Sequence, residues 1–254
     1  CSPFGEQVKT ASALALNEHK EQRISHYREL EREKEMSTVP SNPKIYHIVH
    51  LDKLEPICKA GFLFSDRIAQ QLNLAGTNIG MARIKARRLE KLLNSRPGLC
   101  VGDCVPFYFC PRSIMLFTIH ARNQHLDYKG GQSNIIHLEA DFGAAVDWAN
   151  ASGKRWAFTL SNAGSHYFED RADLGKLNEL NWDAINSRQW GGPEAIPDYK
   201  AGKQAEFLIE EQFPWTLFER IGIMSEGSLL AQVNNIVSQQ QHKPAIEIQP
   251  SWYY

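Results

Sequence analysis

The segment Lys203-Gln204-Ala205-Glu206-Phe207-Leu208-Ile209 places one carboxylate at the start of a short apolar run. Such a run predicts a β-strand. A polar stretch rich in glycine, proline and aromatic residues, 187–202, precedes it and predicts a loop that leads directly to the strand. A charge at the start of a strand is usually a solvated edge residue. Glu206 therefore becomes a candidate site residue only together with other segments of the chain.

The length, composition and net charge are those of an ordinary soluble globular protein. The 254 residues suffice for one sizeable core with an appendage, and 43% hydrophobic with 22% charged residues is a typical balance. The net charge of -1 gives no global argument for a nucleic-acid partner, so any such argument must be local. No apolar run approaches the roughly 20 residues that span a bilayer, and we expect no membrane partner.

Five cysteines form an odd set at low density. This argues against a disulfide framework and for a reducing compartment. Cys100, Cys104 and Cys110 cluster, but no histidine lies at ligand spacing beside them. We expect buried thiols there and no metal.

Two prolines, Pro40 and Pro43, separate a polar, charge-rich stretch from the rest of the chain. Residues 11–37 predict one or two solvated helices or a linker. Proline disfavours helix in the residue before it, so the prolines mark a boundary. We divide the chain into an N-terminal helical or linker segment, 1–43, and one domain, 44–254.

The domain mixes short strands with helices in no regular alternation, which predicts an α+β fold. Strands are predicted at 45–50, 62–64, 105–110, 135–139, 156–159, 206–209 and 221–223. Helices are predicted at 51–61, 77–94, 113–122, 140–151 and 229–240. The tail, 246–254, is rich in proline and aromatic residues and either packs back on the body or is disordered.

Several common enzyme motifs are missing. The sequence contains no Gly-x-Gly-x-x-Gly after a strand, no phosphate-binding loop, no His-Glu-x-x-His and no Gly-x-Ser-x-Gly. Rossmann dehydrogenases, nucleoside triphosphatases, zinc proteases and serine hydrolases are therefore not favoured.

Other polar residues have an ordinary structural explanation when each is taken alone. His47 in a β run could be a core histidine, and Arg87 and Arg88 could be a solvated helix face. Their order changes this interpretation. From about Lys44 to Ile223 the chain resembles the DarT family of ADP-ribosyltransferase toxins. The resemblance is carried by five segments in one consistent order: Ile45–His50, Ile84–Arg88, Val105–Ser113, Gly130–Leu138 and Lys203–Leu208.

The resemblance implies an ADP-ribosyltransferase-like fold, with two facing small sheets splayed around an NAD cleft and helices surrounding them. It implies transfer of ADP-ribose from NAD, as co-substrate and without a metal, to a base of single-stranded DNA. Glu206 would be the catalytic glutamate. Arg88 or its neighbour Arg87 would lie near the diphosphate and the reacting ribose, and the double arginine leaves both alignments open.

The resemblance also assigns the NAD site. His47 would hold the adenosine end or ribose, and Tyr108 would lie along the nicotinamide. The full expected set is His47, Ile48, Val49, Arg67, Tyr108 and Phe109.

The chemistry agrees with these residue types. Cleavage of the nicotinamide–ribose bond develops oxocarbenium character, as in glycoside cleavage, and a fixed carboxylate stabilises that charge. An arginine fork neutralises a diphosphate.

The loop before Glu206 predicts the acceptor site. Arg188, Trp190, Tyr199, Lys200 and Lys203 interleave aromatic rings with cations, as a single-stranded nucleic-acid platform requires, although Trp190 could instead be core. Where thymine-modifying relatives carry a histidine after the Phe-Thr of a strand, this chain has Asn162. Asparagine cannot act as a base, so guanine or another target stays open.

Three alternatives also stay open: RNA or protein as acceptor, hydrolysis of NAD, and a non-catalytic nucleic-acid-binding module. A chain that begins at Cys1 without methionine looks like the released C-terminal domain of an Rhs-type polymorphic toxin. On that interpretation we expect secretion within a larger effector, action in the cytoplasm of a bacterial target cell, and a cognate immunity protein or antitoxin as partner.

Overall fold

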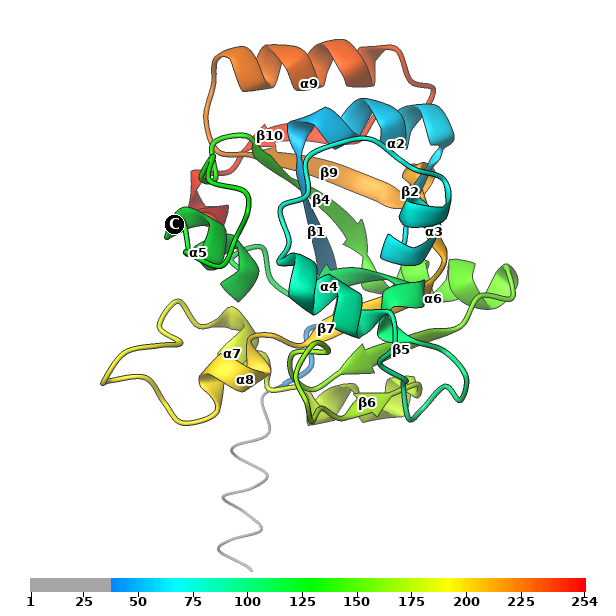
Figure 1. Cartoon of the computed structure of the whole chain (residues 1–254), viewed down its shortest axis with the longest axis vertical. Coiled ribbons are helices and arrows are strands. Elements are labelled where there is room, and N and C mark those ends of the chain that lie inside the picture. The colour runs from blue at the N-terminus through cyan, green and yellow to red at the C-terminus, as the bar shows by residue number, and fades with distance from the viewer. Residues whose placement is uncertain (1–37) are drawn as a thin grey trace, which may run out of the picture. The chain divides into compact units, whose positions relative to one another are not determined.

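One β-sheet of eight strands, in the order β10-β9-β4-β1-β3-β7-β5-β6, carries the fold (Figure 1). The structure, a computed structural model, describes residues 38–254, and the helix or linker predicted for 11–37 lies outside the described residues. The strands are β1 (Lys44–His50), β3 (Cys104–Tyr108), β4 (Ile135–Asp141), β5 (Trp156–Thr159), β6 (Asp170–Arg171), β7 (Glu206–Glu210), β9 (Phe218–Ile223) and β10 (Ala245–Ile248). Strands β2 (Phe62–Phe64) and β8 (Gln212–Pro214) pair separately.

The sheet consists of two halves that meet at one residue pair. Within the first half, β1 and β4 pair from Lys44–Asp141 to His50–Ile135. Within the second, β3 and β7 pair along their whole length. Between the halves, β1 pairs with β3 only where Tyr46 lies opposite Tyr108. The α+β class is confirmed, and the expected pair of small sheets is present as two halves of one sheet with a split beside this pair.

Helices cover the sheet and connect its strands. They are α2 (Leu54–Ala60), α3 (Asp66–Gln71), α4 (Ala82–Arg88), α5 (Ile114–His120), α6 (Phe142–Ala151), α7 (Trp182–Asn186), α8 (Tyr199–Gly202) and α9 (Ser228–Ser238), with 3-10 turns at Leu51–Lys53, Val101–Asp103, Leu174–Glu179, Trp215–Leu217 and Pro250–Trp252. Helices α2 and α9 pack together, and α4 crosses in front of the sheet (Figure 1). Within residues 38–254, no helix is both long and apolar enough to cross a membrane.

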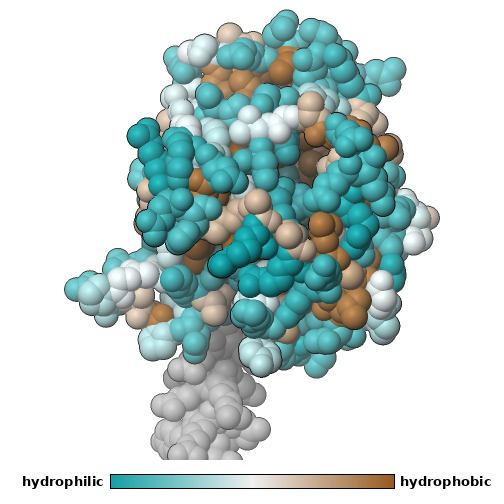
Figure 2. Space-filling view, in the orientation of Figure 1, coloured by the Kyte–Doolittle hydropathy of each residue, from teal (hydrophilic) through white to brown (hydrophobic). Residues whose placement is uncertain are grey.

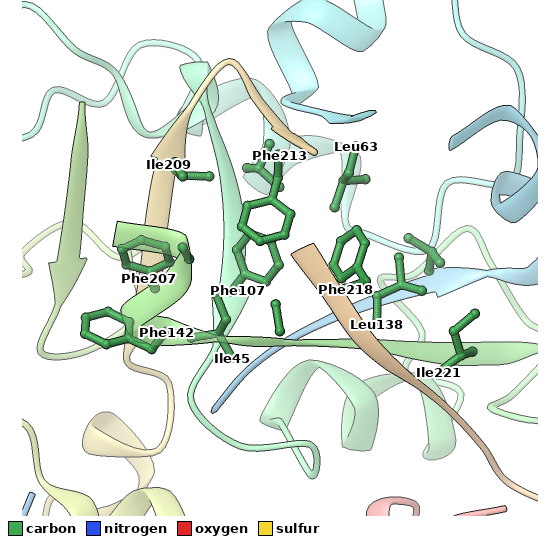
Figure 3. Close-up of a cluster of buried hydrophobic side chains, with 14 of the residues drawn as sticks. Ile45, Leu63, Phe107, Leu138, Phe142, Phe207, Ile209, Phe213, Phe218 and Ile221 are labelled. Carbon is green, nitrogen blue, oxygen red and sulfur yellow. The ribbon is translucent and has the colours of Figure 1, made fainter. Parts of the chain in front are cut away.

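Phenylalanines from four strands form the centre of the core. Phe107, Phe207, Phe213 and Phe218 are fully buried and pack with Ile45 in one hydrophobic cluster (Figure 3). The rings of Phe107 and Phe213 lie 4.7 Å apart, centroid to centroid. Because alternate residues of a strand face opposite sides, Phe107 and Phe207 can enter the core while Tyr108 and Glu206 face away from it.

The helix predicted over 77–94 is much shorter in the structure, where α4 covers Ala82–Arg88. On its N-terminal side, the backbone N–H of Thr77 donates to the Asp52 carboxylate, and its hydroxyl donates to the same carboxylate over 2.6 Å. On its C-terminal side, Leu92 forms a β-bridge with Cys100. Tertiary contacts therefore override the helical periodicity at both ends.

The tail packs back on the body. Strand β10 joins β9, and the buried Tyr253 hydroxyl lies 2.8 Å from the Ile135 carbonyl and 3.0 Å from that of Gly222. A Cβ at position 222 would lie 2.3 Å from the Trp252 ring, so the close approach of the tail requires glycine there.

We expect Phe107→Ala to lower the free energy of unfolding by about 3–5 kcal/mol, because it removes a fully buried ring at the centre of the core. Denaturant titration measures the loss. Leu72→Ala, at a side chain that is 54% exposed, is the control and should change stability by less than about 0.5 kcal/mol. Equal effects of the two substitutions would contradict this assignment of the core.

Candidate active site

Glu206 is buried at the start of β7, with 3% of its surface exposed. Its backbone N–H donates to the Thr159 hydroxyl over 3.0 Å, and it lies opposite Tyr108 in the β3–β7 pairing. Lone carboxylates are almost never buried to this extent. Glu206 is therefore not the solvated edge residue that its place in the sequence allows.

A bidentate ion pair fixes the Glu206 carboxylate. Arg88, the last residue of α4, donates from Nη1 to Oε1 over 3.0 Å and from Nη2 to Oε2 over 2.8 Å. The backbone N–H of Ala163 also donates to Oε1, over 3.1 Å. Burial would lower the pKa of Arg88, but the attraction and hydrogen bonds of Glu206 outweigh it, so its pKa is raised. Of the two adjacent arginines, Arg88 is the one that contacts Glu206.

A cavity of about 190 Å³ lies at the split between the two halves of the sheet. Its walls include β1, β3 and β7 from the sheet, together with α3, α4 and the segment 77–81. Six of the predicted site residues line it: His47, Ile48, Val49, Arg88, Tyr108 and Glu206. Figure 1 shows α4 crossing this face, and hydrophilic side chains cover the same region in Figure 2.

His47 presents a neutral ring to the cavity. Its Nδ1–H donates to the Pro106 carbonyl over 2.7 Å, which leaves Nε2 as an acceptor. Burial lowers the pKa of His47 to about 4. Burial first, and then the charge of Glu206, raise the pKa of Tyr108, so its phenol stays protonated. Both rings can therefore offer uncharged hydrogen-bonding groups to a ligand.

Two lysines on the cavity wall were not predicted as site residues. Lys53 has no side-chain hydrogen bond or ion pair within residues 38–254, whereas Lys85 donates to Asp66 over 2.6 Å. Burial, and then Lys85, lower the pKa of Lys53. In the sequence both lysines fall on amphipathic helical patterns, where a cation is normally solvated. No local signal marked them.

Two residues of the expected NAD set lie elsewhere. Phe109 is buried in the core, where its ring packs against Phe142 and Trp182. Arg67 does not line the cavity, because its guanidinium bonds the Asp103 carboxylate and the Leu89 carbonyl. Strand alternation explains Phe109, since Tyr108 before it faces the cavity and the next side chain must face away.

The loop before Glu206 differs from the expected platform. Lys203 is 2% exposed and donates to the Ile185 carbonyl over 2.7 Å, so it is not a surface cation. Trp190 is half-buried and donates through Nε1 to the Tyr254 hydroxyl over 3.1 Å. Arg188 is exposed and Tyr199 is half-buried. Only part of the predicted cluster is therefore available to a strand of nucleic acid.

Asn162 lies beside the site, one residue before Ala163. Its Nδ2 donates to Gln204 Oε1 over 2.9 Å, and its Oδ1 accepts from the Gly164 backbone N–H over 2.7 Å. The amide therefore shapes the turn that brings the Ala163 N–H to Glu206. No cluster of three or more His, Cys, Asp or Glu residues that could hold a metal occurs in the described part of the chain.

A sheet split around a cavity, with a buried glutamate on its wall, is the arrangement expected of an ADP-ribosyltransferase. Comparison with known proteins defines this class more narrowly. The profile described as "ssDNA thymidine ADP-ribosyltransferase, DarT" matches residues 46–254. The chain belongs to the DarT family.

Relatives of known name match most of the chain. A DNA ADP-ribosyl transferase of Thermus aquaticus is 37% identical over 214 residues, covering 83% of this chain and 88% of that protein. One of Thermus sp. (strain 2.9) is 34% identical over 219 residues, 85% of this chain and 99% of that protein. Two solved structures are similar. Thermus sp. 2.9 DarT in complex with ADP-ribosylated ssDNA has a TM-score of 0.76 and 33% identity, covering 86% of this chain and 99% of that chain. Thermus sp. 2.9 DarT in complex with NAD+ has a TM-score of 0.71 and 32% identity, covering 85% of this chain and 100% of that chain.

The buried His47 should make stability depend on pH. The unfolded chain binds a proton at this ring near pH 6.5, whereas the folded protein does so only near pH 4. The contribution of the neutral ring is therefore fully present above pH 6.5 and is lost as the pH falls towards 4. We expect His47→Gln to reduce the fall in unfolding free energy between pH 7 and pH 4.5, measured by denaturant titration. His125→Gln, at an exposed histidine, is the control and should keep the wild-type slope.

Proposed function

We propose that this protein transfers ADP-ribose from NAD+ to a base of single-stranded DNA and releases nicotinamide. The observation that carries the proposal is the buried Glu206 carboxylate, fixed by Arg88 on the wall of a cavity. Membership of the DarT family, and the relatives solved with NAD+ and with ADP-ribosylated ssDNA, support the same donor and acceptor.

The cavity residues fit a dinucleotide with a central diphosphate. Because Arg88 is neutralised by Glu206 and Lys85 by Asp66, Lys53 is the one of these three cavity cations that is free to face the diphosphate. The neutral Nε2 of His47 can accept a hydrogen bond from a ribose hydroxyl. Tyr108, opposite Glu206, can lie along the nicotinamide. Ile48 and Val49 supply apolar wall between these groups.

The chemistry then follows from the position of Glu206. The bond between nicotinamide and ribose C1 breaks, and its electron pair leaves with nicotinamide. The ribose gains positive charge, which the carboxylate stabilises through a ribose hydroxyl. An electron pair of the base forms the new bond to C1, and the base releases a proton. Arg88 orients the carboxylate for this task because it holds both oxygens.

The acceptor base is thymine or guanine. Thymine is named in the description of the matching family. Guanine is the second candidate because Asn162, whose amide is engaged by Gln204 and Gly164, cannot take a ring proton. Nucleosides released by digestion of modified DNA and analysed by mass spectrometry distinguish the two.

Such an activity on the DNA of its own producer would require a neutralising partner, and we propose a cognate antitoxin or immunity protein. The transferase itself would act in the bacterial cytoplasm, where NAD+ and single-stranded DNA occur together. Delivery within a larger secreted effector stays a prediction.

Glu206→Gln should lower the rate of transfer about 100- to 1,000-fold, because it removes the charge that stabilises the reacting ribose. The assay incubates the protein with NAD+ and, separately, single-stranded DNA, duplex DNA, RNA and protein, followed by mass spectrometry for added ADP-ribose. Glu219→Gln, at a side chain that is 49% exposed, is the control and should keep full activity. Thermal unfolding verifies that both variants are folded.

The same assay decides between the alternatives. A fully active Glu206→Gln variant would contradict the proposal. Wild-type protein that binds single-stranded DNA without releasing nicotinamide would indicate a binding module. Nicotinamide release without an adduct would indicate a glycohydrolase, and an adduct on RNA or protein alone would change the acceptor.

Lys53→Ala should raise KM for NAD+ about tenfold, because one charge-assisted contact to the diphosphate is lost. Lys59→Ala is the matched control, since Lys59 lies at the end of the adjoining helix with its side chain 73% exposed. Steady-state kinetics with varied NAD+ measure both. An equal KM in the two variants would assign the diphosphate to other residues.

A further inference from the structure

The loop 160–169, between β5 and β6, touches Glu206 without lining the cavity. Its Ala163 N–H donates to the same Glu206 oxygen that accepts from Arg88. None of the ten residues of this loop lines the cavity assigned to NAD+. An acceptor that reaches the reacting ribose beside Glu206 can therefore approach over this loop while NAD+ fills the cavity.

Several contacts hold the loop in one conformation. The Leu160 N–H donates to the Glu169 carbonyl over 2.9 Å and closes its base. Asn162 accepts from the Gly164 and Ser165 N–H groups within the turn. Lys91, just after α4, bonds the His166 carbonyl and lies 5.2 Å from the centre of the Phe168 ring. The loop is thus a fixed surface attached to the end of α4.

Two side chains on this surface have no partner within residues 38–254. Tyr167 is 94% exposed, and its ring has neither a ring contact nor a side-chain hydrogen bond. Arg87 has a buried Nε without a hydrogen-bond partner, and its guanidinium forms no ion pair. A Cβ on Gly164 would lie 3.9 Å from Arg87 Nη2, so this guanidinium lies against the loop.

We propose that Arg87 and Tyr167 form a subsite for the acceptor strand. Arg87 binds a phosphate of the single-stranded DNA, and the Tyr167 ring stacks on a base next to the target base. This inference rests on the proposed function. It gives the two adjacent arginines different roles: Arg88 orients the catalytic carboxylate, and Arg87 faces the acceptor.

The chemistry of the two groups matches single-stranded nucleic acid. A guanidinium without an acidic partner can donate two parallel hydrogen bonds to a phosphate. An exposed aromatic ring on a fixed loop can stack on any base, since every base offers a π-face. The loop before Glu206 offers the strand less than expected, because Lys203 donates to the Ile185 carbonyl and Trp190 donates to the Tyr254 hydroxyl.

The test measures DNA binding and kinetics of full-length variants. Binding uses fluorescence anisotropy with labelled random-sequence single-stranded DNA at several salt concentrations. Tyr167→Ala should weaken binding, and raise KM for DNA, about tenfold, whereas Tyr167→Phe should bind like wild type because it keeps the ring. Arg87→Ala should weaken binding about tenfold and lower the slope of log affinity against log salt by about 0.7. KM for NAD+ should not change in any of these variants.

Lys243→Ala and Leu174→Ala, at exposed positions outside the site, are the controls and should bind DNA like wild type. If Tyr167→Ala and Arg87→Ala also bind like wild type, the subsite is refuted while the transfer activity stands. A higher KM for NAD+ with unchanged DNA affinity would refute it too, by placing these residues on the donor side. If wild-type protein neither binds nor modifies single-stranded DNA, the proposed function fails and the subsite with it.

Discussion

The ion pair between Arg88 and Glu206 is the contact on which the site depends. Both side chains are nearly excluded from water, and removal of one partner from such a pair leaves a buried charge at a cost of about 3–5 kcal/mol. The pair joins α4 to β7 across 118 positions of sequence. Any shift of α4 therefore moves the carboxylate, and the elements that position α4 also position the site.

The ion pair with Glu206 limits what else Arg88 can bind. An arginine that holds both oxygens of a carboxylate is not free to bind a diphosphate, and Lys85 is likewise paired with Asp66, so our proposal assigns the diphosphate to Lys53. The loop that carries Ala163 contacts Glu206 but contributes no residue to the cavity lining. Our proposal places the donor in the cavity and the acceptor over this loop. A transferase needs separate places for the two substrates because donor and acceptor must both reach the reacting carbon.

The strands were predicted more accurately than the helices around the site. Apolar runs gave β1, β3, β4, β5 and β7 within a few residues, since each run is buried in the sheet. The helix predicted over 77–94 was reduced to α4, because Asp52 binds Thr77 and Cys100 pairs with Leu92. These partners are distant in sequence, so no local pattern contains them. The same holds for Lys203, which periodicity could not distinguish from a surface lysine.

The sequence by itself determined the α+β class, the family resemblance and the strand that carries Glu206, because these depend on local apolar patterns and on the order of short motifs. Only the tertiary structure decided which arginine meets Glu206, placed Phe109 in the core rather than in the cavity, and brought Lys53 to the cavity wall. The physical reason is that burial and ion pairing are set by residues far apart in the chain, which meet only when the two halves of the sheet come together.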